Sequence, residues 1–133
     1  MIENICILFD GDNAPEIEIS GFNNILRQFG EFLKSVESCK NIFYLNSKPT
    51  QFYSKSINKL EIIVTDIPRM SIDINESQLI LRSDKKTYAK LGKSLINVFV
   101  DDEIEQNFQL DYFEGNELLN ETDAILIFAT SKS

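Results

Sequence analysis

The 133-residue sequence contains no histidine and no tryptophan, and it has only two cysteines, three prolines and five glycines. Without histidine the chain cannot build a serine-histidine triad, an imidazole general base or a proton switch near neutral pH. Cys6 and Cys39 lack the CxxC spacing of a zinc site, so we expect no metal, no cofactor and two reduced thiols. The glycines are scattered singly, which excludes a glycine-rich phosphate-binding loop.

Long hydrophobic runs are also absent. No apolar stretch approaches the roughly twenty residues that span a bilayer. The first residues, Met-Ile-Glu-Asn-Ile-Cys-Ile-Leu, lack the basic region and the cleavage site of a secretory signal. We therefore expect a cytoplasmic protein that does not enter a membrane. The length is that of one domain, so residues 1–133 should fold as a single domain with one core.

The spacing of apolar residues predicts two amphipathic helices among short strands. The first helix should have Ser20 as its N-cap and continue to Val36; the second should begin at Ser83 or Asp84 and run to about Phe99. Strands are expected at residues 4–9, 16–19, 41–45, 60–65, 70–74, 78–82, 108–113 and 124–129. This order predicts an α+β fold: an antiparallel-rich sheet with two amphipathic helices packed on one face.

The two strand-helix segments resemble each other at an offset of 63 residues, which places Ile25 on Tyr88 and Phe32 on Leu95. An internal repeat would produce this likeness. So would the general similarity of any two amphipathic helices that follow strands, and both interpretations remain open.

One motif could carry chemistry: a hydrophobic strand that ends in Asp10-Gly11-Asp12. It resembles the first motif of haloacid-dehalogenase-type phosphatases, in which the first Asp attacks phosphorus and the second acts as acid and base. It also resembles the opening of NYN-type nucleases, in which such an Asp holds a divalent cation. Asp10 and Asp12 would take these roles, with Asp84 as a further candidate.

The other groups that these enzymes need are missing from the expected places. Asp84 is followed by Lys85 and Lys86, whose positive charges would repel a metal ion. We therefore interpret Asp10-Gly11-Asp12 as a polar turn and expect a protein that is not an enzyme. The alternative is a metal-dependent phosphohydrolase or nuclease that uses this Asp-Gly-Asp motif.

Acidic residues are concentrated near the C-terminus. Residues 94–131 include nine Asp and Glu and no Lys or Arg, whereas the rest of the chain is about neutral, so this segment accounts for the whole net charge of −8. Such a surface repels nucleic acid and attracts basic proteins. The plainer interpretation is that acidic loops keep the protein in solution.

Several segments resemble bacterial polymorphic-toxin immunity proteins, specifically the family catalogued as immunity protein 32. They are Ile-Glu-Ile-Ser-Gly at 17–21 with the helix that follows, Leu-Ile-Leu at 79–81 with its helix, Phe-Gln-Leu-Asp-Tyr-Phe-Glu-Gly-Asn-Glu-Leu-Leu at 108–119, and the apolar run 124–128. The family often has histidines where Asn107 and Gln109 stand here. The resemblance implies a cytoplasmic protein that binds and blocks a cognate toxin domain, commonly a nuclease and often basic.

The acidic segment is therefore the predicted binding site for a basic toxin domain. The candidate residues are Asp101, Asp102, Glu103, Glu105, Asp111, Tyr112, Glu114 and Glu117. Phe113 and Leu118 are further candidate anchors. Alternation along a strand would place Tyr112 and Phe113 on opposite faces, and we expect Tyr112 to be the exposed one.

Overall fold

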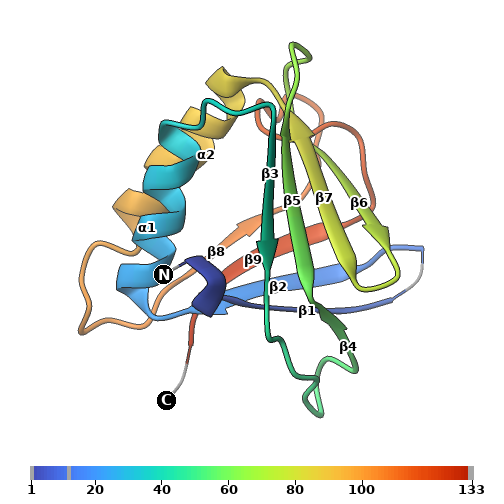
Figure 1. Ribbon diagram of the computed structural model, residues 1–133, viewed down its shortest axis with the longest axis vertical. Coiled ribbons are helices and arrows are strands. Elements are labelled where there is room, and N and C mark those ends of the chain that lie inside the picture. Colours follow the sequence, from blue (N-terminus) through green and yellow to red (C-terminus); the bar gives the residue numbers. More distant parts are fainter. Residues whose placement is uncertain (1, 12, 132–133) are drawn as a thin grey trace.

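The computed structural model describes residues 2–11 and 13–131, and its strands and helices follow the order expected for an α+β fold (Figure 1). A short 3-10 helix occupies Ile2–Asn4, and the α-helices are α1 (Asn23–Lys34) and α2 (Lys85–Val98). The strands are β1 (Cys6–Asp10), β2 (Glu16–Gly21), β3 (Lys40–Tyr44), β4 (Lys55–Ile57), β5 (Lys59–Val64), β6 (Ser71–Asn75), β7 (Gln78–Ser83), β8 (Asn107–Leu110) and β9 (Ile125–Thr130).

The strands form two sheets. Sheet A has the order β4-β1-β2-β9-β8, and sheet B has the order β3-β5-β7-β6. Each sheet contains one parallel pair, β2 with β9 and β5 with β7, and the other pairs are antiparallel. In Figure 1 the two sheets and the helix pair stand on three sides of the molecule.

The two halves of the chain are intertwined repeats of a hairpin, a helix and a second strand pair. The hairpin β1-β2 of the first half pairs with β8 and β9 of the second half, and the hairpin β6-β7 pairs with β3 and β5 of the first. The parallel pair at the centre of each sheet has the same register in both sheets. In sheet A, Glu16–Gly21 lies beside Ile125–Thr130. In sheet B, Gln78–Ser83 lies beside Lys59–Val64. The internal repeat is therefore present, but β2 aligns with β7, and Gly30 with Gly92, at an offset of 62, not 63.

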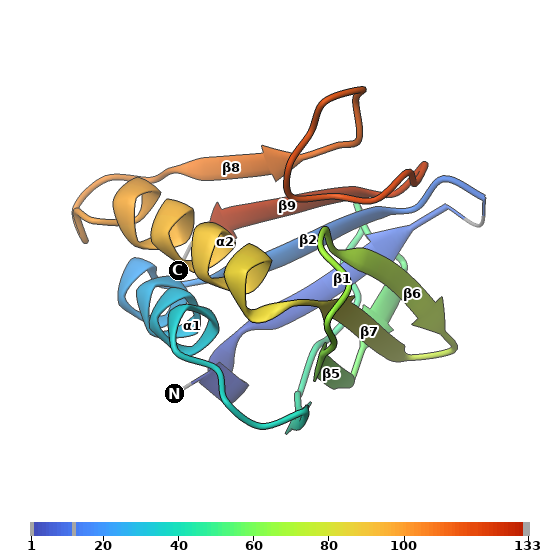
Figure 2. The ribbon, with the colours of Figure 1, turned by 90° about the horizontal axis from the view of Figure 1, so that it is seen from above.

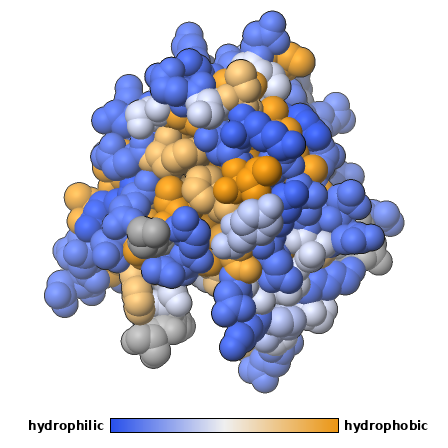
Figure 3. Space-filling view, in the orientation of Figure 1, coloured by the Kyte–Doolittle hydropathy of each residue, from blue (hydrophilic) through white to orange (hydrophobic). Residues whose placement is uncertain are grey.

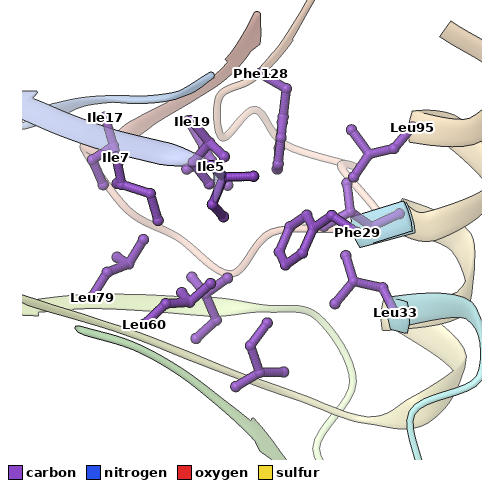
Figure 4. Packing of buried hydrophobic residues seen from close by; sticks show 14 of the residues in the cluster. Ile5, Ile7, Ile17, Ile19, Phe29, Leu33, Leu60, Leu79, Leu95 and Phe128 are labelled. Carbon is purple, nitrogen blue, oxygen red and sulfur yellow. The ribbon is translucent and has the colours of Figure 1, made fainter. Parts of the chain in front are cut away.

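The hydrophobic core lies between the two sheets and the helices (Figure 4). Ile7, Ile17 and Ile19 point into it from sheet A, and Leu60 and Leu79 point into it from sheet B. The helices close the third side with fully buried side chains such as Phe29, Leu33 and Leu95. Burial of these apolar side chains, at roughly 25 cal/mol per Å² removed from water, is the main stabilising contribution.

The helices α1 and α2 lie side by side and touch at Gly30 and Gly92 (Figure 2). A Cβ atom on Gly30 would lie 2.8 Å from the Gly92 carbonyl oxygen, and a Cβ on Gly92 would collide with the Gly30 carbonyl oxygen and the Lys34 nitrogen. These glycines hold equivalent places in the two repeats. Their missing side chains set the close approach of the helices.

The expected α+β class, rich in antiparallel pairing, is confirmed. The strands divide over two sheets, and the three-residue strand β4 was not expected. Asp84 is the N-cap of α2, and it is one of the two starts that the sequence predicted for this helix. Ser20 is wrong as the N-cap of α1, because it lies within β2 and the helix begins after Phe22 without a side-chain cap.

Substituting Gly92 with Ala should lower the free energy of unfolding by about 1 to 2 kcal/mol, because overpacking against helix backbone outweighs the higher helix propensity of Ala. Chemical denaturation measures this change. Lys93→Ala, on the exposed side of the same helix, is the control and should stay within about 0.5 kcal/mol of the wild type. Equal stability of Gly92→Ala and wild type would contradict the close helix contact.

Candidate functional site

The loop of residues 99–106, between α2 and β8, carries four of the predicted site residues: Asp101, Asp102, Glu103 and Glu105. Asn23, at the start of α1, anchors this loop. Its side-chain amide donates to the carbonyl oxygens of Asp101 (2.7 Å) and Ile104 (2.8 Å). The Oδ1 atom of Asn23 accepts a hydrogen bond from Thr130 (2.6 Å), which ties the loop to the end of β9. The loop is therefore fixed to two elements.

Arg27, one turn further along α1, fixes the beginning of the same loop. Its guanidinium donates to the carbonyl oxygen of Phe99 at 2.8 Å and to the Asp102 carboxylate at 2.6 Å. The hydrogen bond from Arg27 lowers the pKa of the Asp102 carboxyl. Asp102 is therefore partly neutralised within the molecule, whereas the side chains of Glu103 and Glu105 extend into solvent.

The other four predicted residues, Asp111, Tyr112, Glu114 and Glu117, lie in the loop 111–124 between β8 and β9. Asn116 organises this loop: its amide donates to the Asp111 carbonyl oxygen (2.9 Å), and its Oδ1 accepts from the Leu118 backbone (2.7 Å). Glu117 forms a 3.3 Å ion pair with Lys90 of α2.

The eight predicted residues therefore do not form one cluster. They occupy two loops at opposite ends of β8, which lies at the edge of sheet A (Figure 2). At about 3.4 Å per residue, the five steps from residue 106 to residue 111 separate the loops by roughly 17 Å. A partner protein that covers the edge of sheet A could contact both loops, but a small ligand could not.

The choice of Tyr112 as the exposed aromatic residue is wrong. Phe113 has 62% of its surface exposed, whereas Tyr112 is half-buried. The physical reason is that β8 ends at Leu110, so the alternation of a strand does not continue to residues 112 and 113. The turn around Asn116 directs these side chains instead.

The Asp-Gly-Asp motif lies in the connection between β1 and β2. Gly11 has a φ of 92°, which suits a turn residue, and Asp10 accepts a long hydrogen bond from Ser54 (3.5 Å). Asp84 caps α2 by accepting a 2.8 Å hydrogen bond from the Thr87 backbone. Asp12 lies outside the described residues. Among the residues that are described, no group of three or more His, Cys, Asp or Glu is placed to hold a metal ion.

A groove that the sequence did not indicate lies on the outer face of sheet A, opposite the core. It has a volume of about 830 Å³. Leu8, Glu16 and Glu18 line it from the sheet, and Phe52 and Tyr53 line it from the connection between β3 and β4. This connection forms the lowest part of the molecule in Figure 1.

Local hydrogen bonds hold the wall of the groove in place. The Ile7 backbone donates to Ser47 Oγ at 2.9 Å, which attaches the connection to β1. Thr50 closes a tight turn, because its nitrogen donates to the Tyr53 carbonyl oxygen (2.9 Å) and its hydroxyl accepts from the Tyr53 nitrogen (3.2 Å). This turn presents Tyr53 to the sheet and leaves Phe52 76% exposed.

Tyr53 lines the groove together with Glu16 and Glu18, and the three side chains influence one another electrostatically. Burial, together with the negative charges of both glutamates, raises the pKa of Tyr53 to about 12, so the phenol remains a hydrogen-bond donor at neutral pH. Burial also raises the pKa of the Glu18 carboxyl, and the charge of Glu16 adds to this effect. Two carboxylates therefore lie in one groove with a neutral phenol.

A second hollow, of about 490 Å³, adjoins this groove. It is lined by Phe22, Asn23, Asn24, Asp102, Glu103, Ile104, Glu105, Thr130 and Ser131, and the first groove also includes Thr130 and Ser131. Within the described part of the chain, no Lys or Arg lines either hollow, although five carboxylates do. Phe22 and Ile104 are about half exposed beside these charges.

A different surface lies between α1 and β3, where apolar side chains gather (Figure 3). Phe32 and Phe43 meet there edge to face, with their ring centroids 5.1 Å apart, and both pack against the core. Hydrophilic residues surround this area in Figure 3.

No family model, no curated protein and no solved structure matches this chain. Among the described residues, no helix is both long enough and apolar enough to cross a membrane. The resemblance to immunity proteins and the absence of enzyme activity accordingly stay predictions. The candidate site is defined by its geometry and charge alone.

Replacing Glu18 with Gln should raise the thermal unfolding temperature at pH 7. The raised pKa of Glu18 means that its ionised form costs stability in the folded protein at neutral pH. This cost vanishes as the pH falls below the ordinary value of 4.5 for an unfolded Glu, so the difference from wild type should disappear there.

Thermal unfolding followed by circular dichroism at both pH values measures this effect. Glu31→Gln, an exposed change on α1, controls for the loss of one negative charge. A Glu18→Gln variant that is less stable than wild type at pH 7 would show that the carboxylate is stabilising where it lies.

Proposed function

We propose that this protein is an immunity protein that binds a basic toxin domain and neutralises it by occlusion. The proposed location is the cytoplasm, and the proposed partner is the cognate toxin domain, commonly a nuclease, and not a nucleic acid. The observation that carries the proposal is the pair of adjoining hollows lined by carboxylates, without a lining Lys or Arg among the described residues.

The arrangement of this surface suits a protein partner. Exposed apolar side chains, Phe22 and Ile104, lie beside Glu103 and Glu105. Protein interfaces commonly combine such apolar contacts with a charged rim, in which the charges act mainly on the rate of association. The loop that carries these residues is fixed by Asn23 and Arg27, so binding would not require it to become ordered.

Occlusion requires no catalytic group. A standard protein interface covers roughly 800 Å² on each partner, which is enough to block the active site of a small toxin domain. The two acidic loops and the edge strand β8 between them provide an extended surface of this kind. A basic active site built to hold nucleic acid would be attracted to the same negative charge.

Reversing Glu103 and Glu105 to Lys should slow association with the toxin domain encoded beside this gene by about tenfold and flatten its salt dependence, since rim charges steer encounter. Surface plasmon resonance at several salt concentrations measures both quantities. Asp111→Lys, Glu114→Lys and Glu117→Lys, together in one variant, test the loop at the other end of β8 and should slow association severalfold.

The matched control is Glu31→Lys with Asp66→Lys, which changes the net charge by the same amount as the Glu103 and Glu105 pair but on exposed positions elsewhere. This control should retain most of the wild-type rate. If both acidic-loop variants behave as the control does, the interface lies on another surface and the acidic loops only solvate the protein.

A further inference from the structure

The outer face of sheet A can be compared with the outer face of sheet B, because the two repeats share one register. By this register Glu16 corresponds to Gln78, Glu18 to Ile80 and Ser20 to Arg82. Likewise Leu8 corresponds to Asp73, Ile127 to Glu61 and Asn107 to Lys40. The molecule therefore contains two versions of the same surface.

The outer face of sheet B neutralises its own carboxylates. Arg82 binds Asp73 at 2.5 Å, and Lys40 binds Glu61 at 3.1 Å. Gln78 also donates to Glu61 at 2.7 Å. Each acid on this face therefore has a cation from a neighbouring strand.

Among the described strand positions, the outer face of sheet A has carboxylates but no such cations. Ser20 and Asn107 occupy the positions that Arg82 and Lys40 occupy in sheet B, and none of the outward strand positions described on this face is Lys or Arg. Glu16 and Glu18 share the groove with the neutral phenol of Tyr53. Lys48 belongs to the connection that forms the wall, but it does not line the groove.

We propose that this groove binds an arginine side chain of the partner protein, with the guanidinium held by Glu16 and Glu18 against the ring of Phe52. A guanidinium presents several donors in one plane, which suits two carboxylates, and it stacks well on an aromatic ring. It would supply from outside the positive charge that Arg82 and Lys40 supply in sheet B. The proposal rests on the proposed function in taking a protein as the source of the arginine.

The groove can be tested without the toxin by titrating the full chain with N-acetyl-arginine amide and following backbone resonances by NMR. The expected result is a saturable change in the chemical shifts of the residues that line the groove, which are Glu16, Glu18 and the turn 50–53. The neutral isostere N-acetyl-citrulline amide should produce no such shift. Shifts spread evenly over all acidic loops would overturn the proposal.

Substitution identifies the groups that bind. Glu16→Gln with Glu18→Gln should weaken arginine amide binding by about fivefold, the effect of losing two exposed ion pairs. Phe52→Ala should weaken it as well, and this ring is exposed enough to be removed without unfolding the protein. Glu31→Gln with Glu121→Gln removes the same charge from exposed positions elsewhere and should leave binding unchanged. Equal losses in both double variants would reduce the effect to net charge and overturn the proposal.

A cation of the chain itself is the competing occupant. Lys132 follows Ser131 in the sequence, and Ser131 lines both hollows. Lys132→Gln should leave the affinity for arginine amide unchanged. Tighter binding by this variant would mean that the groove already holds an internal cation, which contradicts the proposal.

Measuring binding to the toxin domain then tests this inference separately from the proposed function. If the wild type binds the toxin domain and the Glu16 and Glu18 double variant binds several times more weakly, both stand. If the double variant binds as tightly as wild type, the groove proposal fails and the proposed function stands. If the wild type does not bind, the proposed function fails, and so does the assignment of the arginine to this partner.

Discussion

The contact between Gly30 and Gly92 is the constraint on which the rest of the structure depends. It brings the two helices so close that residues of α1 reach the chain that leaves α2: Arg27 binds the Phe99 carbonyl oxygen, and Asn23 binds the loop beyond it. The same contact lies between equivalent positions of the two repeats. Since each repeat contributes strands to both sheets, the helix contact also sets how the sheets meet around the core.

The repeats share their backbone plan but differ in charge. Sheet B pairs its outward carboxylates with Arg82 and Lys40, whereas sheet A gathers carboxylates on its outer face and on the loops at its edge. Pairing of the first kind neutralises the charges within the fold, while unneutralised charge on a rigid surface is costly for the protein alone. This asymmetry, and not the acidic composition in general, motivates the assignment of a binding surface to sheet A.

Much of the secondary structure was predictable from the sequence, because the apolar spacing of both helices and the alternation of most strands are strong local signals. The exchange of strands between repeats was not, since it depends on contacts far apart in the sequence. The acidic loops were identified from charge, but Tyr112 was chosen over Phe113 as the exposed residue because β8 ends earlier than the alternation indicates. Glu16 and Glu18 carried a signal in their alternation with Ile17 and Ile19; Tyr53 reaches them only through the fold.

The most direct test of the central claim, that the acidic face and edge of sheet A bind a basic protein, is hydrogen-deuterium exchange of the protein with and without the proposed toxin domain. Slower exchange is predicted in the loop 99–106, in β8 and in the turn 50–53. Exchange in the outer strands β3 and β6 of sheet B should not change. Protection confined to sheet B, with none on these three segments, would contradict the account.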